Sequence, residues 1–135
     1  MDKRYLIKIP LVLFDTSALL LSIREGINLL NRISDIVEGT YMPVVTRAVL
    51  EELDKLAKYG SPRMRHNVEF IKSIINDNFA VADVGGDADE SIMRFSANHK
   101  CVVATCDMEL KHRLEKMGVG VIYFRKSSRR FESNF

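Results

Sequence analysis

The chain has 135 residues, 47% hydrophobic and 28% charged, a balance typical of one globular domain with one core. Its 20 lysines and arginines stand against 18 acids, and the net charge of +2 excludes a strongly basic or strongly acidic chain. No apolar stretch approaches the roughly 18 residues that a membrane span requires.

The first third of the chain predicts one strand and two helices. The apolar run at 11–14 is a strand, and Thr16 or Ser17 can cap a short helix through residue 23. A second helix over about 27–37 carries its apolar residues on one face and ends at Gly39.

The middle third predicts a strand and two further helices. Residues 41–45 form the strand, and Thr46 is a good N-cap for a helix that runs to Tyr59. The run Gly60-Ser61-Pro62 then ends that helix and starts another. The new helix places these apolar residues on one face: Met64, Val68, Ile71 and Ile75.

The last third alternates strands with helices. Asp87 and Glu90 form a capping box that opens a helix to about residue 99, and Gly118 ends a later helix that begins near Met108. Three apolar runs supply the strands: 79–82, 101–105 and 119–124.

Strands that alternate with helices favour a parallel sheet between two helical layers. We therefore expect a single α/β domain over 1–135, with its core from about 11 to 131. Its expected architecture is a three-layer α/β/α fold around a central, mainly parallel five-stranded sheet.

Carboxylates stand at or beside the ends of these strands. Asp15 follows the first strand, Asp107 follows the run 101–105, and Asp89 follows the strand at 79–82 after two glycines. Glu52 lies on the helix after Thr46. Because the carboxyl ends of parallel strands share one edge of a sheet, these acids can surround one crevice. Gathered charges of one sign repel unless a cation joins them, so the pattern predicts a metal site.

Helical phase separates these acids from their neighbours. At about 100° per residue, Glu52 borders the apolar face of its helix, whereas Glu51 points to water. Asp89 borders the apolar face of the next acidic helix, and Glu90 points away. We therefore expect Glu52 and Asp89, rather than their neighbours, to face the crevice.

A structural explanation exists for each residue taken singly. An Asp after a strand is commonly a helix cap, but other residues can supply the caps here, so capping explains the four acids together poorly. Ser17 and Thr105 are either ordinary cap and strand-end hydroxyls, or they orient a carboxylate or a metal-bound water. The sequence leaves these two readings open, and it contains no Cys/His zinc pattern.

Four segments in this order resemble the PIN-domain nucleases. They are Phe14-Asp15-Thr16-Ser17, Glu51-Glu52-Leu53, Asp87-Ala88-Asp89-Glu90-Ser91-Ile92 and Ala104-Thr105-Cys106-Asp107. The resemblance covers about 11–131. The run 99–107 and the closing run 122–126 look like the archaeal and eukaryotic branch that processes small-subunit ribosomal RNA, while VapC-type toxins share the acids.

The resemblance implies an endoribonuclease that depends on Mg²⁺ or Mn²⁺. The family's four metal-binding acids map to Asp15, Glu52, Asp89 and Asp107, and its two small hydroxyls map to Ser17 and Thr105. Those six residues are the expected catalytic set. Hard oxygen ligands suit Mg²⁺, which can activate water and offset charge on a phosphodiester. The family leaves a 5′-phosphate and a 3′-hydroxyl.

Basic residues flank the acids and suit a polyanion such as RNA. Between residues 111 and 130, seven lysines and arginines stand against a lone Glu115. The expected RNA-binding residues are Lys55, Lys58, Arg63, Arg65, Arg125, Lys126, Arg129 and Arg130. Tyr123, Phe124 or Phe131 could stack on unpaired bases, although core packing is favoured for the first two.

Several alternatives remain. A VapC-type toxin with an antitoxin partner is the nearest rival, followed by a non-catalytic RNA-binding PIN scaffold. A phosphoacceptor receiver would use Asp83, Thr105 and Lys126, but Thr16 stands where its second acid is needed. A haloacid-type phosphatase needs an Asp where Ser17 stands.

The cysteines and the start of the chain bear on location and partners. Cys101 and Cys106 flank one strand and cannot bridge each other, so we expect reduced, buried thiols in a cytoplasmic protein. Lys8 and Pro10 interrupt the first apolar run, which makes it a poor signal peptide. The expected partners are RNA, a second copy of the chain, and an antitoxin or pre-ribosome proteins; no membrane is expected.

Overall fold

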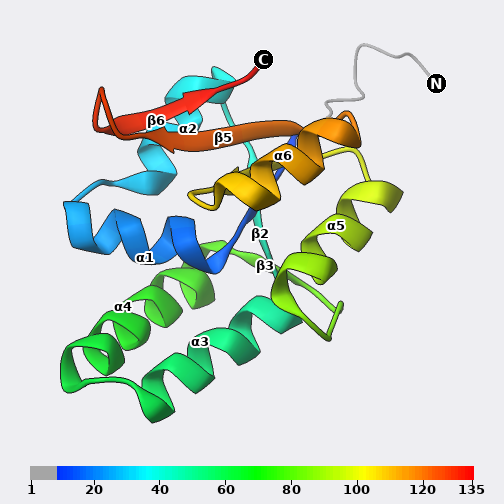
Figure 1. The fold of residues 1–135 in the computed structure, drawn as a ribbon. Coiled ribbons are helices and arrows are strands. Elements are labelled where there is room, and N and C mark those ends of the chain that lie inside the picture. The colour runs from blue at the N-terminus through cyan, green and yellow to red at the C-terminus, as the bar shows by residue number, and fades with distance from the viewer. Residues whose placement is uncertain (1–8) are drawn as a thin grey trace.

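The computed structural model describes residues 9–135 (Figure 1). The first eight residues of the expected domain lie outside this range, as does most of the stretch that was considered as a signal peptide. The elements alternate along the chain as expected, with short strands joined by helices. In order they are β1 (Leu11–Phe14), α1 (Thr16–Glu25), α2 (Leu29–Val37), β2 (Met42–Thr46), α3 (Arg47–Tyr59), α4 (Pro62–Asn78), β3 (Ala80–Ala82), α5 (Ala88–Asn98), β4 (Val102–Thr105), α6 (Met108–Lys116), β5 (Gly120–Arg125) and β6 (Arg130–Ser133).

The strands form one sheet in the order β3-β2-β1-β4-β5-β6. β1 to β5 are parallel, and β6 pairs antiparallel with β5. The predicted α/β class with a mainly parallel sheet is confirmed, but the sheet has six strands where five were expected. The missed strand is only four residues long and carries one fully buried side chain, Phe131, so periodicity gave it little signal.

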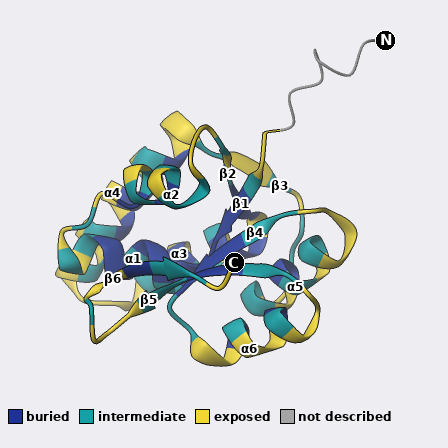
Figure 2. Cartoon of the chain, turned by 90° about the horizontal axis from the view of Figure 1, so that it is seen from above, coloured by how far each residue is buried: buried dark blue, intermediate teal, exposed yellow. Residues whose placement is uncertain are grey.

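Helices cover both faces of the sheet, which confirms the three-layer architecture (Figures 1 and 2). α1 and α2 lie on one side, and α5 and α6 pack on the other. α3 packs against both α4 and α5. In Figure 2 the strands near the centre are dark blue, because the helical layers bury them, and the outer helical surfaces are yellow.

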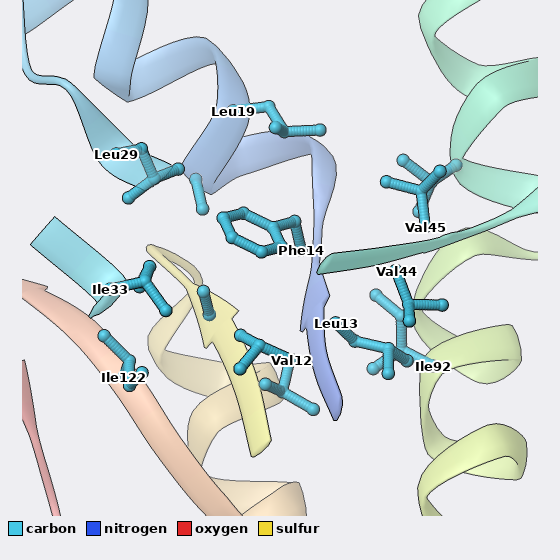
Figure 3. Packing of buried hydrophobic residues seen from close by; sticks show 14 of the residues in the cluster. Val12, Leu13, Phe14, Leu19, Leu29, Ile33, Val44, Val45, Ile92 and Ile122 are labelled. Atoms are coloured by element: carbon cyan, nitrogen blue, oxygen red, sulfur yellow. The ribbon is translucent and has the colours of Figure 1, made fainter. Parts of the chain in front are cut away.

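The core follows from alternation along β1, where successive side chains point to opposite faces. Phe14 points toward Leu19 and Leu29, whereas Leu13 lies with Val44 and Ile92 on the side of α5 (Figure 3). Phe14 also makes an edge-on contact with Phe79, with ring centroids 5.0 Å apart. Both faces of β1 are thus buried, as expected for a central parallel strand. The strand at 79–82 differs, since β3 forms an edge and leaves Val81 half exposed.

The helix caps match the sequence at three positions and differ at one. Thr46, Ser61 and Asp87 cap α3, α4 and α5 as predicted. The cap of α1 is Asp15 rather than Thr16 or Ser17, because its carboxylate accepts a hydrogen bond from the Ala18 amide.

Both cysteines are free, in agreement with the sequence, but each is half-buried rather than fully buried. Cys101 and Cys106 lie just outside the two ends of β4. Within residues 9–135, none of the helices combines the length and the apolar character needed to cross a bilayer.

Candidate active site

The pairing of β1 with β4 brings two acids from distant parts of the chain together. Phe14 is in register with Ala104, and the Asp15 amide donates to the Ala104 carbonyl at 3.1 Å. Asp15 and Asp107 therefore follow the carboxyl ends of neighbouring strands. The chain leaves β1 toward β2 and leaves β4 toward β5, so the connections diverge here and open a crevice, as at the switch point of other open α/β sheets.

A pocket of about 240 Å³ occupies this crevice. The structure brings five of the six predicted catalytic residues into its lining, and the sixth, Thr105, lies directly behind Asp15. The lining residues are Asp15, Thr16, Ser17, Glu52, Asp87, Ala88, Asp89 and Asp107. Thr16 and Asp87 were considered only as cap residues, because sequence gives no sign that a capping side chain also borders a pocket.

Two hydroxyl groups hold the Asp15 carboxylate. Ser17 Oγ donates to it at 2.8 Å, and Thr105 Oγ1 donates to its Oδ2. Each hydroxyl in turn accepts a backbone amide, Ser17 from Cys106 at 2.9 Å and Thr105 from Asp107 at 2.9 Å. Hydrogen bonds through these two hydroxyls thus connect the backbone amides that follow β4 to the Asp15 carboxylate, which follows β1. The sequence left open whether Ser17 and Thr105 are ordinary cap and strand-end hydroxyls or orient a carboxylate or a metal-bound water. In the structure, both hydroxyls donate to the Asp15 carboxylate.

Burial and crowding raise the pKa values of three acids in the pocket. Asp15 is only 4% exposed, and its burial raises its pKa from 3.8 to about 6, against the opposing hydrogen bonds. Burial also raises the pKa of Asp89, as do the charges of Asp107 and Asp87. The pKa of Glu52 is raised by burial and by the charges of Asp89 and Asp87. The acids therefore lie close enough to repel one another.

Asp107 has a second task as the N-cap of α6. Its Oδ1 accepts from the amides of Glu109 at 2.9 Å and Leu110 at 3.2 Å. Among the described residues Oδ2 takes part in no such bond, so one oxygen of this acid stays available to the pocket. Capping and a role in the pocket are thus compatible in the same side chain.

The donor set fits a hard divalent cation. Five carboxylates line the pocket, and the charges of Asp87, Asp89 and Asp107 raise the pKa values of their neighbours. Within residues 9–135 the buried hydroxyl of Thr16 lies near Glu52 but has no partner at hydrogen-bond distance. A hydrated cation would offset the repulsion and bring water to that hydroxyl. The described side chains form no ready-made cluster of three metal ligands. Mg²⁺ does not require one, since it binds through one or two carboxylates and keeps several waters.

The helical phase predicted from sequence is confirmed on both helices. Glu52 is half-buried in the pocket, while Glu51 is exposed and pairs with Arg47 at 2.8 Å. Asp89 is half-buried, while Glu90 is exposed. Periodicity was sufficient here because both acids lie on regular helices whose apolar faces are plain in the sequence.

The predicted RNA-binding residues fall into two groups, and all of them are exposed. Lys55, Lys58, Arg63 and Arg65 lie along α3 and α4. Arg125, Lys126 and Arg129 line a groove of about 640 Å³ together with Tyr123 and Phe124, and Arg130 lies on β6. The groove shares the segment 106–108 with the acidic pocket, because Cys106 and Met108 line it and Asp107 lines the pocket.

Two details differ from the sequence-based expectation. Phe131 is fully buried against Phe124, with ring centroids 5.5 Å apart, so stacking of a base on Phe131 was a wrong prediction. Arg125 forms an ion pair with Glu132, and Arg129 forms one with Glu25. No local pattern in the sequence indicated that these acids lie beside the two arginines. The cationic character of the groove is therefore weaker than the sequence suggests.

Comparison with known proteins gives a consistent family match. Residues 12–127 match the family described as PIN like domain. The mouse (Mus musculus) rRNA-processing protein FCF1 homolog is 29% identical over 114 residues, which cover 83% of this chain and 56% of that protein. Ribonuclease VapC9 of Archaeoglobus fulgidus is 25% identical over 88 residues, covering 65% of this chain and 64% of that one. The chain thus spans little more than half the length of its FCF1 relatives.

A solved structure shares the fold. The structure described as that of the PIN domain endonuclease Utp24 superimposes with a TM-score of 0.75 over 92% of this chain and 90% of the other, at 24% sequence identity. This likeness concerns the fold, because an identity this low does not carry residue roles.

Proposed function

Because this chain belongs to the PIN-like domain family, we propose that it is a divalent-metal-dependent endoribonuclease that hydrolyses RNA phosphodiester bonds. One observation carries the proposal: Asp15, Glu52, Asp89 and Asp107 line a single pocket although they come from four separate parts of the chain. The use of Mg²⁺ or Mn²⁺ as the cofactor belongs to the same proposal.

Each residue of the pocket has a distinct task in this proposal. Asp15 and Asp107 would hold the ion directly, and Asp89 and Glu52 would complete the site or orient water. The bound ion would supply an acidic water and offset charge on the phosphodiester. Ser17 and Thr105 hold the Asp15 carboxylate in one orientation at the pocket through their hydrogen bonds.

The exposed basic residues would bind the RNA backbone on two sides of the pocket. Lys55 is near enough to Glu52 for its charge to oppose part of the rise in the pKa of that acid. The basic residues of α3 and α4 therefore begin at the edge of the pocket. On the other side, Lys111 lies 4.6 Å from the centre of the Tyr123 ring, beside the groove formed with Arg125, Lys126 and Arg129. Tyr123 and Phe124 are half-buried and line this groove, where they would stack on an unpaired base.

Processing of ribosomal RNA is the biological role we favour, since FCF1 proteins match most of the chain. Pre-ribosome proteins, a second copy of the chain and a cytoplasmic location are part of that proposal. The match to VapC9 supports a second candidate, a toxin ribonuclease with an antitoxin partner. A small antitoxin gene directly upstream would favour the toxin.

A cleavage assay tests the proposed activity. The full chain is incubated with a fluorescent single-stranded RNA at increasing Mn²⁺ or Mg²⁺, with and without a chelator. We expect products that carry a 5′-phosphate and appear only with the metal. Binding of the RNA without metal-dependent cleavage would instead indicate a non-catalytic scaffold.

Glu52 and Glu51 provide a matched test of the pocket. Glu52→Gln should lower the single-turnover cleavage rate on the order of 10- to 100-fold, because it removes a charge from the site. Glu51→Gln should stay within about twofold, since it loses only a solvent-exposed pair with Arg47. Equal losses in the two variants would mean that α3 does not present Glu52 to the reaction.

A further inference from the structure

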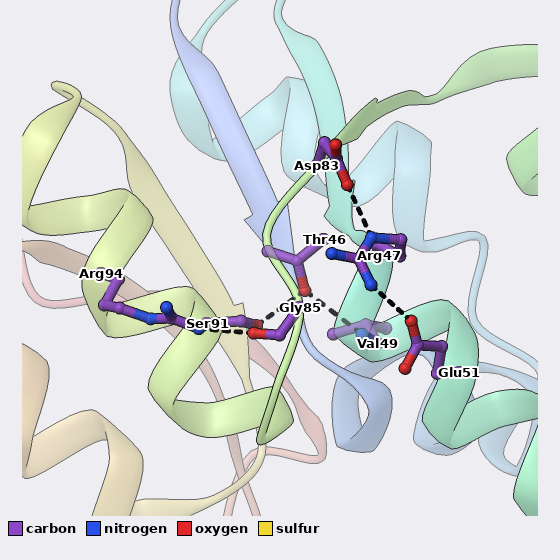
Figure 4. Close-up of polar contacts among 8 residues, drawn as sticks. All are labelled: Thr46, Arg47, Val49, Glu51, Asp83, Gly85, Ser91 and Arg94. Atoms are coloured by element: carbon purple, nitrogen blue, oxygen red, sulfur yellow. Dashed lines mark hydrogen bonds and ion pairs between the residues drawn. The ribbon is translucent and has the colours of Figure 1, made fainter.

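Thr46 and Ser91 form a buried contact between the two helices that carry Glu52 and Asp89. Their hydroxyl oxygens are 2.8 Å apart, and both residues are fully buried (Figure 4). Thr46 is the last residue of β2 and the N-cap of α3, and Ser91 lies in the first turn of α5. The contact therefore joins the beginnings of α3 and α5, directly beside the pocket.

Neighbouring contacts fix the direction of this hydrogen bond. Ser91 Oγ donates its only proton to the Ala88 carbonyl at 2.6 Å, so Thr46 must be the donor to Ser91. Thr46 Oγ1 in turn accepts from the Val49 amide at 3.2 Å. A polarised chain thus runs from the Val49 amide through both hydroxyls to the Ala88 carbonyl, one residue before Asp89.

The same helices carry charges that repel each other. The charge of Asp89 acts on Glu52, and both acids line the pocket. This repulsion acts to separate the start of α5 from α3, so an opposing tie is needed if both acids are to share one ion.

The Ala48 amide at the start of α3 also donates to the Val84 carbonyl in the loop before α5, at 3.0 Å. The other polar side-chain ties between these segments lie at the surface within residues 9–135. The Arg47 guanidinium bridges Asp83 and Glu51 and covers Gly85, and Arg94 donates to the Gly85 carbonyl (Figure 4). The Arg47 side chain is half exposed and that of Asp83 is 87% exposed. Solvent strongly screens such exposed pairs. In the buried contact, by contrast, a hydroxyl that lost its partner could not form a hydrogen bond to water instead, so breaking this contact is costly. The buried contact is therefore the strongest of these side-chain ties.

We propose that Ser91, through its bond from Thr46, is a positioning residue that holds Asp89 beside Glu52 in the acidic pocket. Ser91 does not face the ion or the substrate and acts only through the placement of α5. The expected effect on metal binding rests on the proposed metal-dependent function. The effect on the placement of α5 can be measured on the metal-free chain.

Ser91→Ala tests the proposal with two separate readouts. Amide hydrogen exchange of the metal-free chain should show protection in the first turns of α5 reduced on the order of tenfold, with α6 unchanged. Mn²⁺ binding, followed by electron paramagnetic resonance, should weaken on the order of tenfold, in the range expected for loss of a group that orients a ligand. If wild type binds no Mn²⁺, the proposed function fails, while the exchange result still decides the structural part.

Ser22→Ala is the matched control. Ser22 is also buried, and its hydroxyl donates to the carbonyl of Leu19, three residues earlier, at 2.7 Å. Among the described residues this hydroxyl forms no hydrogen bond to another helix. This variant should leave α5 protection and Mn²⁺ affinity unchanged. Losses in Ser22→Ala equal to those in Ser91→Ala would overturn the proposal, because they would show a general cost of removing a buried serine.

Variants at Thr46 keep the test decisive if Ser91→Ala folds poorly. Thr46→Val removes the donor to Ser91 and should reproduce the α5 and Mn²⁺ losses, whereas Thr46→Ser keeps the hydroxyl and should retain near-wild-type behaviour. Unchanged α5 protection in Ser91→Ala would refute the contact as a tie. Lost protection with unchanged Mn²⁺ affinity would refute its role in the pocket.

Discussion

Asp15→Asn is expected to lower the metal-dependent cleavage rate by at least about a hundredfold, more than is typical for loss of a group that only orients a ligand. Asn keeps the size of the side chain and is itself a good N-cap, so the hydrogen bond from the Ala18 amide can remain. What disappears is the negative charge of the carboxylate that Ser17 and Thr105 hold. Cleavage by Asp15→Asn at the wild-type rate would remove Asp15 from the mechanism.

The same substitution should stabilise the metal-free protein. Folding raises the pKa of Asp15 from 3.8 to about 6, so between these values the folded state binds a proton that the unfolded state has released. The free energy of unfolding contributed by Asp15 therefore falls as pH rises from about 4 to about 6. Above that range the loss is complete and amounts to about 3 kcal/mol. Asp15→Asn should recover part of it, because the Asn amide nitrogen cannot accept the hydrogen bond that Thr105 donates to Asp15 Oδ2.

Thermal or urea unfolding at several pH values, with a chelator present, measures this effect. The difference in free energy of unfolding between Asp15→Asn and wild type should grow from pH 4 to pH 6 and then level off. Taking the difference removes the contributions of acids that do not interact with Asp15, including the lowered pKa values of Glu115 and Glu132. Asp35→Asn, an exposed acid on α2, is the control and should show no such trend. A flat difference would mean that the charge of Asp15 is not costly in the fold.

Phe131→Ala is expected to reduce the free energy of unfolding by about 3–5 kcal/mol, the usual cost of truncating a fully buried phenylalanine. Phe131 is the buried anchor of β6, packs edge-on against Phe124, and its carbonyl accepts a hydrogen bond from Arg32 of α2. A domain of this size has a total stability of about 5–15 kcal/mol, so the loss would be a large part of it.

Urea unfolding followed by circular dichroism gives the measurement, and Phe135→Ala is the control. Phe135 is the same residue type four positions later but is 62% exposed, so its loss should cost less than about 1 kcal/mol. If both variants lose the same stability, β6 does not belong to the cooperative core of the protein.

Local signals in the sequence were enough to find every helix, five of the six strands and the four predicted acids. Thr46, Ser61 and Asp87 are caps in both the prediction and the structure, because a cap depends on contacts within three or four residues. Helical phase distinguished Glu52 from Glu51 for the same reason. The position of Asp15 and Asp107 at the ends of buried strands was also readable, since apolar runs mark such strands.

Other parts of the site had no local signal. Asp15 is tied to Thr105 from 90 residues away, and Thr46 meets Ser91 across 45 residues. Both contacts depend on which strands and helices become neighbours, and a serine or threonine near a helix start resembles an ordinary cap in sequence. Burial of Ser91 was missed because a polar residue counts against the apolar face.

By itself the sequence determined the α/β class, nearly every helix and strand, and four of the five acids that line the pocket, because backbone propensity, capping and periodicity act over short distances. Only the tertiary structure decided that β4 lies beside β1, that β6 closes the sheet, and that two hydroxyls from distant segments hold Asp15. Those features arise from strand pairing and side-chain packing between residues far apart along the chain, and such contacts leave no periodic trace in the sequence.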